Sequence, residues 1–270
     1  MYSVQHIIWI GICIAVIGIS LLLIRRYKPD EKTVFTAACV VCLLSEVAKV
    51  LSTVKMLPLA DGSTCVPFID RQELPLHLCS IQIIFILVIR FVLRKDSGLK
   101  TSLLGFMFPT MTIGALFAIF LPSVFSNILA SLAFIHPQFY QMFLFHAMLI
   151  VLGVYIYTSR FSEWKTKHYF RALGGLIGLA FIGIYINSLL AYVTVGADHQ
   201  VASVERITNF FFVVKTPVGI ALTEKAHWFI YLAIIIALAF VTVGLPFIPV
   251  FIRDIRARRA AKAAPEDRHH

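Results

Sequence analysis

The residues of this chain best suited to chemistry are one cysteine and two histidines in apolar segments. Cys79 follows His77 by two residues near the start of one segment, and His146 lies near the middle of another. A thiol beside an imidazole can act as a base-activated nucleophile, because the imidazole takes the thiol proton. In a regular helix His77 and Cys79 point to nearly opposite sides, so His146 is the expected base for Cys79.

Further polar residues lie in or beside apolar segments and are the expected substrate contacts. They are Glu46, Lys49, Gln82, Asn187, Asn209 and Lys215. Polar side chains left facing lipid would each cost several kcal/mol, so a shared polar pocket is expected. The amides of Gln82, Asn187 and Asn209 suit a developing oxyanion. The ammonium of Lys215 suits a lipid phosphate at the mouth of the pocket.

The composition is that of a membrane protein. Of 270 residues, 59% are apolar and 14% charged, and the mean hydropathy is +0.87. These values exclude a soluble enzyme and a secreted disulfide scaffold. The net charge of +10 does not indicate nucleic acid, because the basic residues form short clusters beside apolar segments.

Seven apolar segments have about the 20 residues that a transmembrane helix needs. They are residues 5–24, 33–54, 74–93, 101–121, 138–158, 171–195 and 226–251. We therefore predict an all-α, polytopic bundle of seven transmembrane helices. The first segment has no basic region before it and no small-residue cleavage site after it, which predicts a retained anchor.

Basic residues alternate between the two sides of this bundle. One side carries seventeen Lys and Arg residues and the other five. By the positive-inside rule the N-terminus is outside and the C-terminus cytoplasmic. Residues 1–255 are then the membrane domain, and the basic tail 256–270 is expected to be disordered. The aromatic segment 205–222 either re-enters the membrane or lies on its outer surface.

Four helices are expected to place polar groups at a similar depth. At about 1.5 Å per residue, Glu46, Gln82 and His146 each lie about 12 Å below the outer end of their helix. Asn187 lies at about the same depth. The sequence therefore predicts one polar layer in the outer half of the bilayer.

Structural alternatives stay open for most of these residues. Glu46 and Lys49, three residues apart, suit an ion pair within one helix. His146 suits a core histidine, and Gln82 and Asn187 suit hydrogen bonds between helices. Cys79 suits a small apolar residue or a disulfide with Cys65.

Two features of the helices are also open to a structural interpretation. Arg90 can extend to the nearer membrane surface, which requires no function. Pro109 and Gly114 are expected to kink or break the fourth helix.

Several motifs together resemble one family. The segment LPLHLCSIQ (residues 74–82) is similar to the start of the third helix in the YwaF-like bacterial membrane proteins, relatives of vertebrate transmembrane protein 164. GALFAIFLP (114–122), FYQMFLFHAMLIVLGVY (139–155), YINSLL and TNFFFVVKTP resemble later motifs of this family, in the same order. The resemblance covers roughly residues 30 to 250.

The resemblance implies a multi-pass protein of the bacterial plasma membrane and a lipid-directed activity. The vertebrate relatives are regarded as phospholipid acyltransferases, and their proposed cysteine and histidine pair falls on Cys79 and His146. More remote relatives are intramembrane lipid hydrolases that use a threonine and a histidine. The chain departs from the family pattern in a longer loop over residues 193–206 and in Phe210 and Phe211, which replace Tyr-Met.

The expected function is acyl transfer or acyl-ester hydrolysis on a membrane lipid. Cys79 is the expected nucleophile, His146 the base and His77 a further candidate. No metal is expected, because no motif with metal-ligand spacing is present. No other cofactor and no nucleic acid is expected. The alternative is a transporter or binding protein that uses the same pocket without covalent chemistry. The oligomeric state stays open.

Overall fold

The computed structural model describes residues 3–59, 62, 64–94, 97–121, 130–196, 200–216 and 220–263. Within these residues six long helices are apolar enough to cross a membrane. They are α1 (Val4–Tyr27), α2 (Glu31–Thr53), α4 (Gly98–Phe120), α6 (Pro137–Ser159), α7 (Thr166–Leu189) and a continuous last helix made of α8 (Lys225–Gly244), η6 (Leu245–Phe247) and α9 (Ile248–Ala263). The protein is therefore a multi-pass membrane protein with six candidate spans.

The third predicted segment is a shorter helix than expected. It consists of α3 (Leu78–Leu87) and one π-helical turn, η2 (Val88–Val92). Together they measure about 22 Å, against about 30 Å for a bilayer core. The residues before them form the 3-10 turn η1 (Arg71–Glu73), and His77 is extended. The start predicted at residue 74 therefore moves to residue 78.

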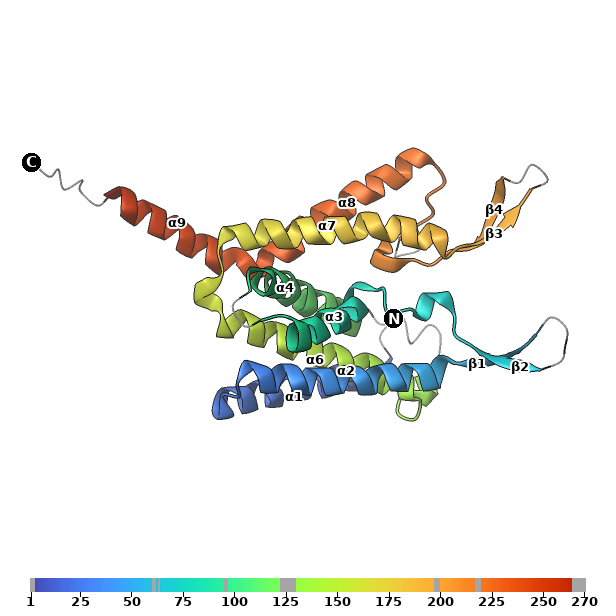
Figure 1. The fold of residues 1–270 in the computed structure, drawn as a ribbon, viewed down its shortest axis with the longest axis horizontal. Coiled ribbons are helices and arrows are strands. Elements are labelled where there is room, and N and C mark those ends of the chain that lie inside the picture. The colour runs from blue at the N-terminus through green and yellow to red at the C-terminus, as the bar shows by residue number, and fades with distance from the viewer. Residues whose placement is uncertain are drawn as a thin grey trace, which may run out of the picture.

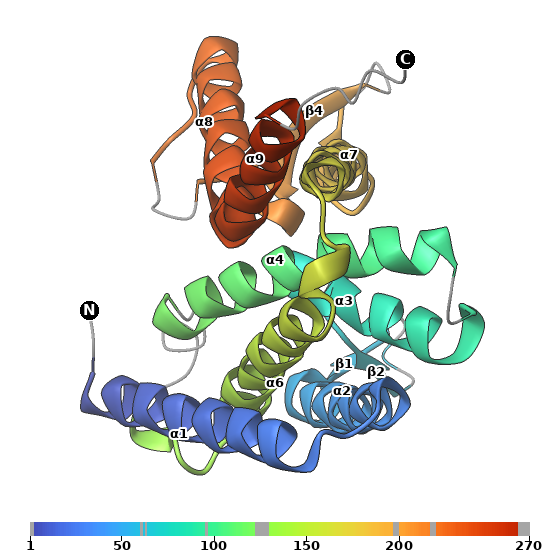
Figure 2. The ribbon, with the colours of Figure 1, turned by 90° about the vertical axis from the view of Figure 1, so that its left-hand side faces the viewer.

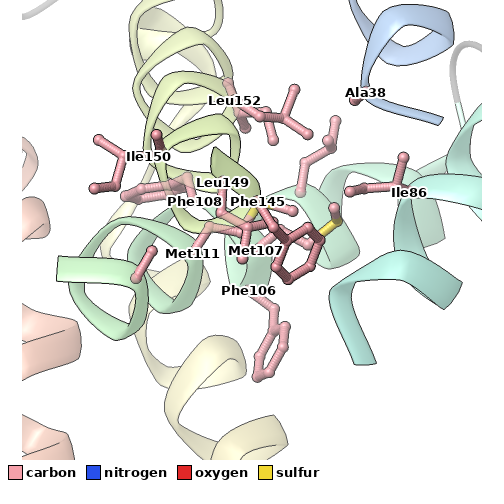
Figure 3. Close-up of a cluster of buried hydrophobic side chains, with 14 of the residues drawn as sticks. Ala38, Ile86, Phe106, Met107, Phe108, Met111, Phe145, Leu149, Ile150 and Leu152 are labelled. Carbon is pink, nitrogen blue, oxygen red and sulfur yellow. The ribbon is translucent and has the colours of Figure 1, made fainter. Parts of the chain in front are cut away.

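The helix α4 lies at the centre of the bundle. It packs against α3, α6, α7 and α8, while α6 also contacts α1 and α2. In Figure 2, α7, α8 and α9 form one group beside the group of α1, α2, α3 and α6, with α4 between them. The buried core includes Met107 and Met111 of α4, Ile86 of α3 and Phe145 of α6 (Figure 3).

The proline in α4 does not break the helix. α4 runs without interruption from Gly98 to Phe120, with Pro109 inside it. The hydroxyls of Thr110 and Thr112 bond back to the carbonyls of Phe106 and Phe108 within the same helix, at 2.8 and 2.7 Å. Of the kink or break that the sequence predicted, the break is absent, and one argument for a transporter is lost with it.

Two β-hairpins project from one end of the molecule, here named the hairpin end (Figure 1). One pairs β1 (Lys55–Pro58) with β2 (Cys65–Phe68), and the other pairs β3 (Tyr192–Val195) with β4 (Val201–Arg206). Arg71 joins their bases: its Nη1 donates to the carbonyls of Leu190 and Ala191, at 3.1 and 3.2 Å. The sequence predicted a loop at the first hairpin and at β4, whereas β3 lies at the end of the segment 171–195 that was predicted to be helical; that helix ends at Leu189.

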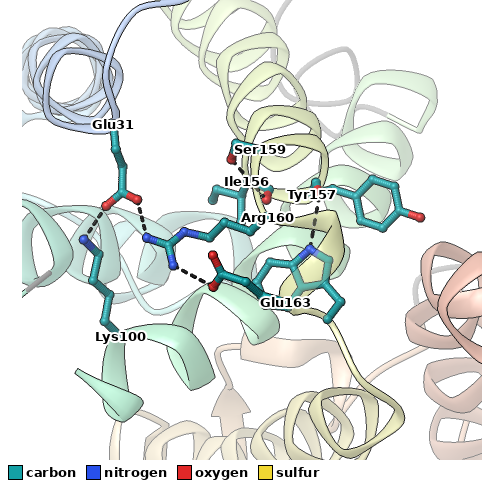
Figure 4. Close-up of polar contacts among 8 residues, drawn as sticks. Glu31, Lys100, Ile156, Tyr157, Ser159, Arg160 and Glu163 are labelled. Carbon is teal, nitrogen blue, oxygen red and sulfur yellow. Dashed lines mark hydrogen bonds and ion pairs between the residues drawn. The ribbon is translucent and has the colours of Figure 1, made fainter. Parts of the chain in front are cut away.

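The opposite end, here named the charged end, carries an ion network between three helices (Figure 4). The carboxylate of Glu31 on α2 binds Lys100 of α4 and Arg160, which follows α6; the Arg160 contact measures 2.6 Å. Arg160 also binds Glu163 of η4 (Phe161–Glu163) at 2.9 Å. Lys100 is 5% exposed, so Glu31 neutralises a nearly buried cation.

The last helix reaches beyond the predicted membrane domain. α9 continues through residues 256–263, which the sequence assigned to a disordered tail, whereas residues 264–270 lie outside the described part. Asp254 ties this helix to the start of α7, because its carboxylate accepts from the backbone N–H and the hydroxyl of Thr166 at 3.0 and 2.9 Å.

The ion network predicts a large difference between two conservative substitutions. Glu31→Gln leaves Lys100 and Arg160 without their shared carboxylate and should lower the free energy of unfolding by about 3 kcal/mol. Glu163→Gln removes only a more exposed partner of Arg160 and should cost less than about 1 kcal/mol. Thermal unfolding of both variants in detergent measures the difference. Equal effects would show that Glu31 does not hold the charged end together.

Candidate functional site

Cys79 is the second residue of α3, and this follows from where the helix starts. His77 is the N-cap residue, with extended backbone angles (φ −68°, ψ 153°), and its side chain makes no capping hydrogen bond. The first backbone N–H groups of any helix have no acceptor inside the helix. Here these groups belong to Leu78, Cys79 and Ser80, and no described residue accepts from them. Cys79 therefore lies at an open helix N-terminus, by which we mean one whose first N–H groups have no acceptor among the described residues.

The Cys79 thiol faces α4. Its Sγ lies 3.8 Å from the position that a Cβ on Gly114 would take. The side chain is half-buried, and the thiol is free. Gly114 thus leaves the sulfur a space beside the central helix that a larger residue would narrow.

The helix α6 runs antiparallel to α4, as two contacts show. Gly153 of α6 lies against Thr112 of α4 so closely that an added Cβ would overlap the hydroxyl. Toward the other end, the His6 ring lies 6.0 Å from the Phe143 ring of α6, and its Nε2 lies 2.8 Å from the Ile119 carbonyl of α4. Along the bundle axis, residue 153 of α6 therefore lies near the level of residue 112 of α4, and residue 143 lies near the level of residue 119.

His146 lies between these two levels of α6. Counted at about 1.5 Å per residue from these two contacts, it lies roughly 3 to 8 Å along the helix axis from the level of Gly114 and hence of Cys79. Its Nδ1 lies 2.6 Å from the Met142 carbonyl. A carbonyl only accepts, so Nδ1 carries the proton and Nε2 holds the free lone pair. No hydrogen bond joins His146 to Cys79 in the described structure, although both are half-buried.

Gln82 adds an unpaired acceptor near this level. It is fully buried, and its Nε2 donates to the Thr110 hydroxyl of α4 at 3.0 Å. Its Oε1 is buried and receives no donor from any described residue. A buried amide oxygen without a donor costs about 1–3 kcal/mol, which a ligand hydroxyl or N–H would recover. The sequence did not single out Thr110, although it is a hydroxyl residue beside the proline of an apolar helix.

Glu46 and Lys49 form the ion pair that was one of the alternatives. Lys49 Nζ lies 2.7 Å from Glu46 Oε2 on the same helix. Burial raises the pKa of the neighbouring Glu73 carboxyl, and the Lys49 ammonium opposes this shift. Both partners of the pair are thus occupied by each other, and their substrate-binding role stays a prediction.

Asn187 holds a segment that we name the aromatic loop, residues 207–216. Its Nδ2 donates to the Phe210 carbonyl at 3.1 Å, and its Oδ1 accepts from the Phe210 N–H at 2.8 Å. The same oxygen accepts from the Thr208 hydroxyl at 2.9 Å. Asn187 is fully buried, so its amide replaces the backbone partners that this irregular segment lacks.

Asn209 shapes the loop from within. Its amide donates to the Lys215 carbonyl at 2.9 Å and accepts from the N–H groups of Val214 and Lys215, at 3.1 and 3.0 Å. Phe211 and Phe212 have positive φ values of 59° and 55°. Aromatic residues rarely adopt this conformation, so surrounding contacts must maintain it. The ammonium of Lys215 is exposed.

The loop connects three helices. Trp228 Nε1 of α8 donates to the Val213 carbonyl at 2.9 Å, and the Tyr231 hydroxyl donates to the Phe212 carbonyl at 2.5 Å. On its other side the Phe210 ring lies 4.8 Å from the His77 ring, edge to face. The aromatic loop therefore lies beside His77, the N-cap residue of α3. The sequence predicted one segment over 205–222, whereas residues 205 and 206 belong to β4 and residues 217–219 lie outside the described part.

One alternative that the sequence left open, the disulfide, has a structural outcome. Cys65 and Cys79 are both free, so the disulfide that was left open does not form. Among the described residues no group of three or more His, Cys, Asp or Glu side chains is arranged to hold a metal ion.

Comparison with known families now adds to this geometry. The model of the TMEM164 family matches residues 1–247. The chain belongs to the TMEM164 family. No curated protein and no solved structure matches significantly. The match confirms the family resemblance and extends it to the first helix.

The segments that carry the family resemblance meet in pairs. Cys79 of LPLHLCSIQ faces Gly114 of GALFAIFLP. Asn187 of YINSLL binds Phe210 of TNFFFVVKTP. His77 links the two pairs through its contact with Phe210. Four of the five family motifs therefore come together near the hairpin end, around the N-terminus of α3.

The aromatic loop predicts opposite results for two glycines of α7. A Cβ on Gly183 would lie 2.7 Å from the Phe211 ring, whereas a Cβ on Gly178 would meet nothing within 4 Å. Gly183→Ala should therefore destabilise by about 1–3 kcal/mol through overpacking. Gly178→Ala should be neutral or stabilise by up to about 1 kcal/mol, because alanine favours helix. Thermal unfolding in detergent compares them, and equal stability would refute the close packing of the loop on α7.

Proposed function

We propose that the protein transfers or hydrolyses acyl groups of a membrane lipid, with Cys79 as nucleophile and His146 as general base. The observation that carries this proposal is the position of Cys79 at the open N-terminus of α3. A helix N-terminus stabilises a thiolate. Its free N–H groups also suit the oxyanion that forms when a thiolate attacks an ester carbonyl.

The reaction has two balanced steps. His146 Nε2 takes the proton of the Cys79 thiol, and the sulfur adds to the ester carbonyl of the lipid. The tetrahedral intermediate collapses, the lipid alkoxide leaves, and the imidazolium returns the proton to it. A hydroxyl of a second lipid, or water, then attacks the thioester while His146 takes and returns its proton. The thiol is restored, and the acyl group has moved to the acceptor.

The polar neighbours have different parts in this proposal. The N–H groups of Leu78, Cys79 and Ser80 are the main oxyanion donors, and the second Nε2 hydrogen of Gln82 is a further donor. The Gln82 Oε1 accepts from a lipid hydroxyl. Asn187 and Asn209 act indirectly, because their amides hold the aromatic loop beside His77. Lys215, exposed on that loop, binds the lipid phosphate.

The arrangement in the membrane is also a proposal. We propose that α3 with η2 crosses the bilayer as a seventh segment, with the hairpin end outside and the charged end cytoplasmic in a bacterial plasma membrane. Cys65, exposed on β2, then reacts with a membrane-impermeant maleimide in intact cells. If Cys65 is labelled only after the cells are broken, the hairpin end is cytoplasmic and the proposed orientation is wrong. Cys65→Ser is the control for the site of labelling.

The covalent step predicts an acylated Cys79. The purified protein in vesicles of a phospholipid with labelled acyl chains should acquire a hydroxylamine-sensitive label on Cys79, identified by peptide mass. Cys79→Ala should lose both the label and the lipid turnover, whereas Cys65→Ala should keep both. His146→Gln should lower turnover by about 10²–10⁴-fold, the usual contribution of a general base.

The same experiment separates the enzyme from the alternative, a transporter or binding protein with the same pocket. The irregular aromatic loop favours this alternative, since transporters use such segments at their binding sites. A transporter gives lipid movement without any acyl label. Turnover that is unchanged in Cys79→Ala would end the enzymatic proposal.

A further inference from the structure

Arg90 is a cation with unused donors in an apolar helix. Its Nε donates to the Thr36 hydroxyl of α2 at 2.7 Å, and its guanidinium carbon lies 4.8 Å from the centre of the Phe91 ring. The side chain is half-buried. No described residue accepts a hydrogen bond from its two terminal amino groups, and no carboxylate pairs with it. An unpaired guanidinium at the edge of a bilayer favours an anionic partner.

Arg90 lies within a π-helical turn. η2 spans Val88–Val92 and closes with a hydrogen bond from the Leu93 N–H to the Val88 carbonyl, at 3.0 Å. A π-turn holds one more residue than an α-turn and so changes the direction of the side chains in it. Such turns are frequent at functional sites.

A shallow groove of about 550 Å³ lies on the face of α2 that carries Thr36, the hydrogen-bond partner of Arg90. It is lined by Lys32, Thr33, Thr36, Ala37 and Val40, which form one face of α2. The lining changes along the helix from a cation, through two hydroxyls, to two apolar side chains over about 12 Å. The phosphate, glycerol and acyl chains of a phospholipid follow the same order.

Two acidic residues at this end of α2, both within the described part of the chain, are already engaged. Asp30 caps α2, because its carboxylate accepts from the Thr33 N–H at 3.1 Å. Glu31 binds Lys100 and Arg160 on the other side of the helix. Among the described residues at the groove, the charges without a partner are therefore the two cations, Lys32 and Arg90.

We propose that this groove binds a phospholipid by its phosphate. The two terminal amino groups of Arg90 donate to two phosphate oxygens, the geometry in which arginine recognises phosphate. Lys32 binds a third oxygen, and the acyl chains lie along Ala37 and Val40. The groove is at the charged end, away from Cys79, so it is a separate lipid site that does not depend on the proposed enzymatic activity.

Native mass spectrometry of the detergent-purified, delipidated chain tests this site. Added phosphatidylglycerol should bind, whereas diacylglycerol with the same acyl chains should not. Arg90→Gln should weaken phosphatidylglycerol binding about tenfold, the effect of losing charge-assisted hydrogen bonds. Arg94→Gln, an exposed arginine one turn further along the chain, is the matched control and should bind like the unchanged protein.

Two further measurements keep the test decisive. Lys32→Gln, at an exposed position, should weaken binding without affecting folding, and it replaces Arg90→Gln if that variant does not fold. Glycerol 3-phosphate at the same concentration should not compete, because it lacks the acyl chains. The proposal is overturned if Arg90→Gln and Lys32→Gln both bind phosphatidylglycerol as tightly as the unchanged protein, or if Arg94→Gln loses as much affinity as Arg90→Gln. It is also overturned if diacylglycerol binds as tightly as phosphatidylglycerol, or if glycerol 3-phosphate competes fully.

Discussion

One constraint governs this molecule: a polar group inside the bilayer has to find its partner within the protein. In the regular helices, the backbone N–H and carbonyl groups satisfy this constraint by bonding to each other. Irregular segments meet it through side chains, as when the Asn187 amide binds both the N–H and the carbonyl of Phe210. Charged side chains meet it in pairs, as in the network of Glu31 with Lys100 and Arg160. These contacts join helices that are distant in the sequence, so the constraint also determines how the bundle is assembled.

Polar groups that have no hydrogen-bond partner among the described residues are the basis of both proposals. They are the first N–H groups of α3, the Gln82 Oε1 and the terminal amino groups of Arg90. The first two lie near Cys79, toward the hairpin end, and the third lies at the charged end. Because polar groups in an apolar environment are usually paired, we propose that the polar part of a lipid pairs with these groups. Both proposals apply this single argument at different ends.

Much of this organisation could be predicted from the sequence. The apolar segments indicated the helices, and the motifs around Cys79 and Asn187 identified the family. The start of α3 at Leu78 was not predictable from apolar periodicity, because the extended backbone of His77 and the preceding 3-10 turn determine it. The hairpins were missed because their strands are short and exposed. The fate of Glu46 and Lys49 also needed coordinates, since i, i+3 spacing suits a pair and a pocket equally.

The central claim is that the Cys79 thiol and the His146 ring share one space beside α4. Mercuric ion bridges two thiols that lie close together, so His146→Cys in a Cys65→Ser chain tests this claim directly. Peptide mapping by mass spectrometry should find a mercury bridge between residues 79 and 146. Leu144→Cys, exposed on the same helix, should give no bridge to Cys79. The absence of a bridge from position 146, or an equal bridge from position 144, would contradict the account.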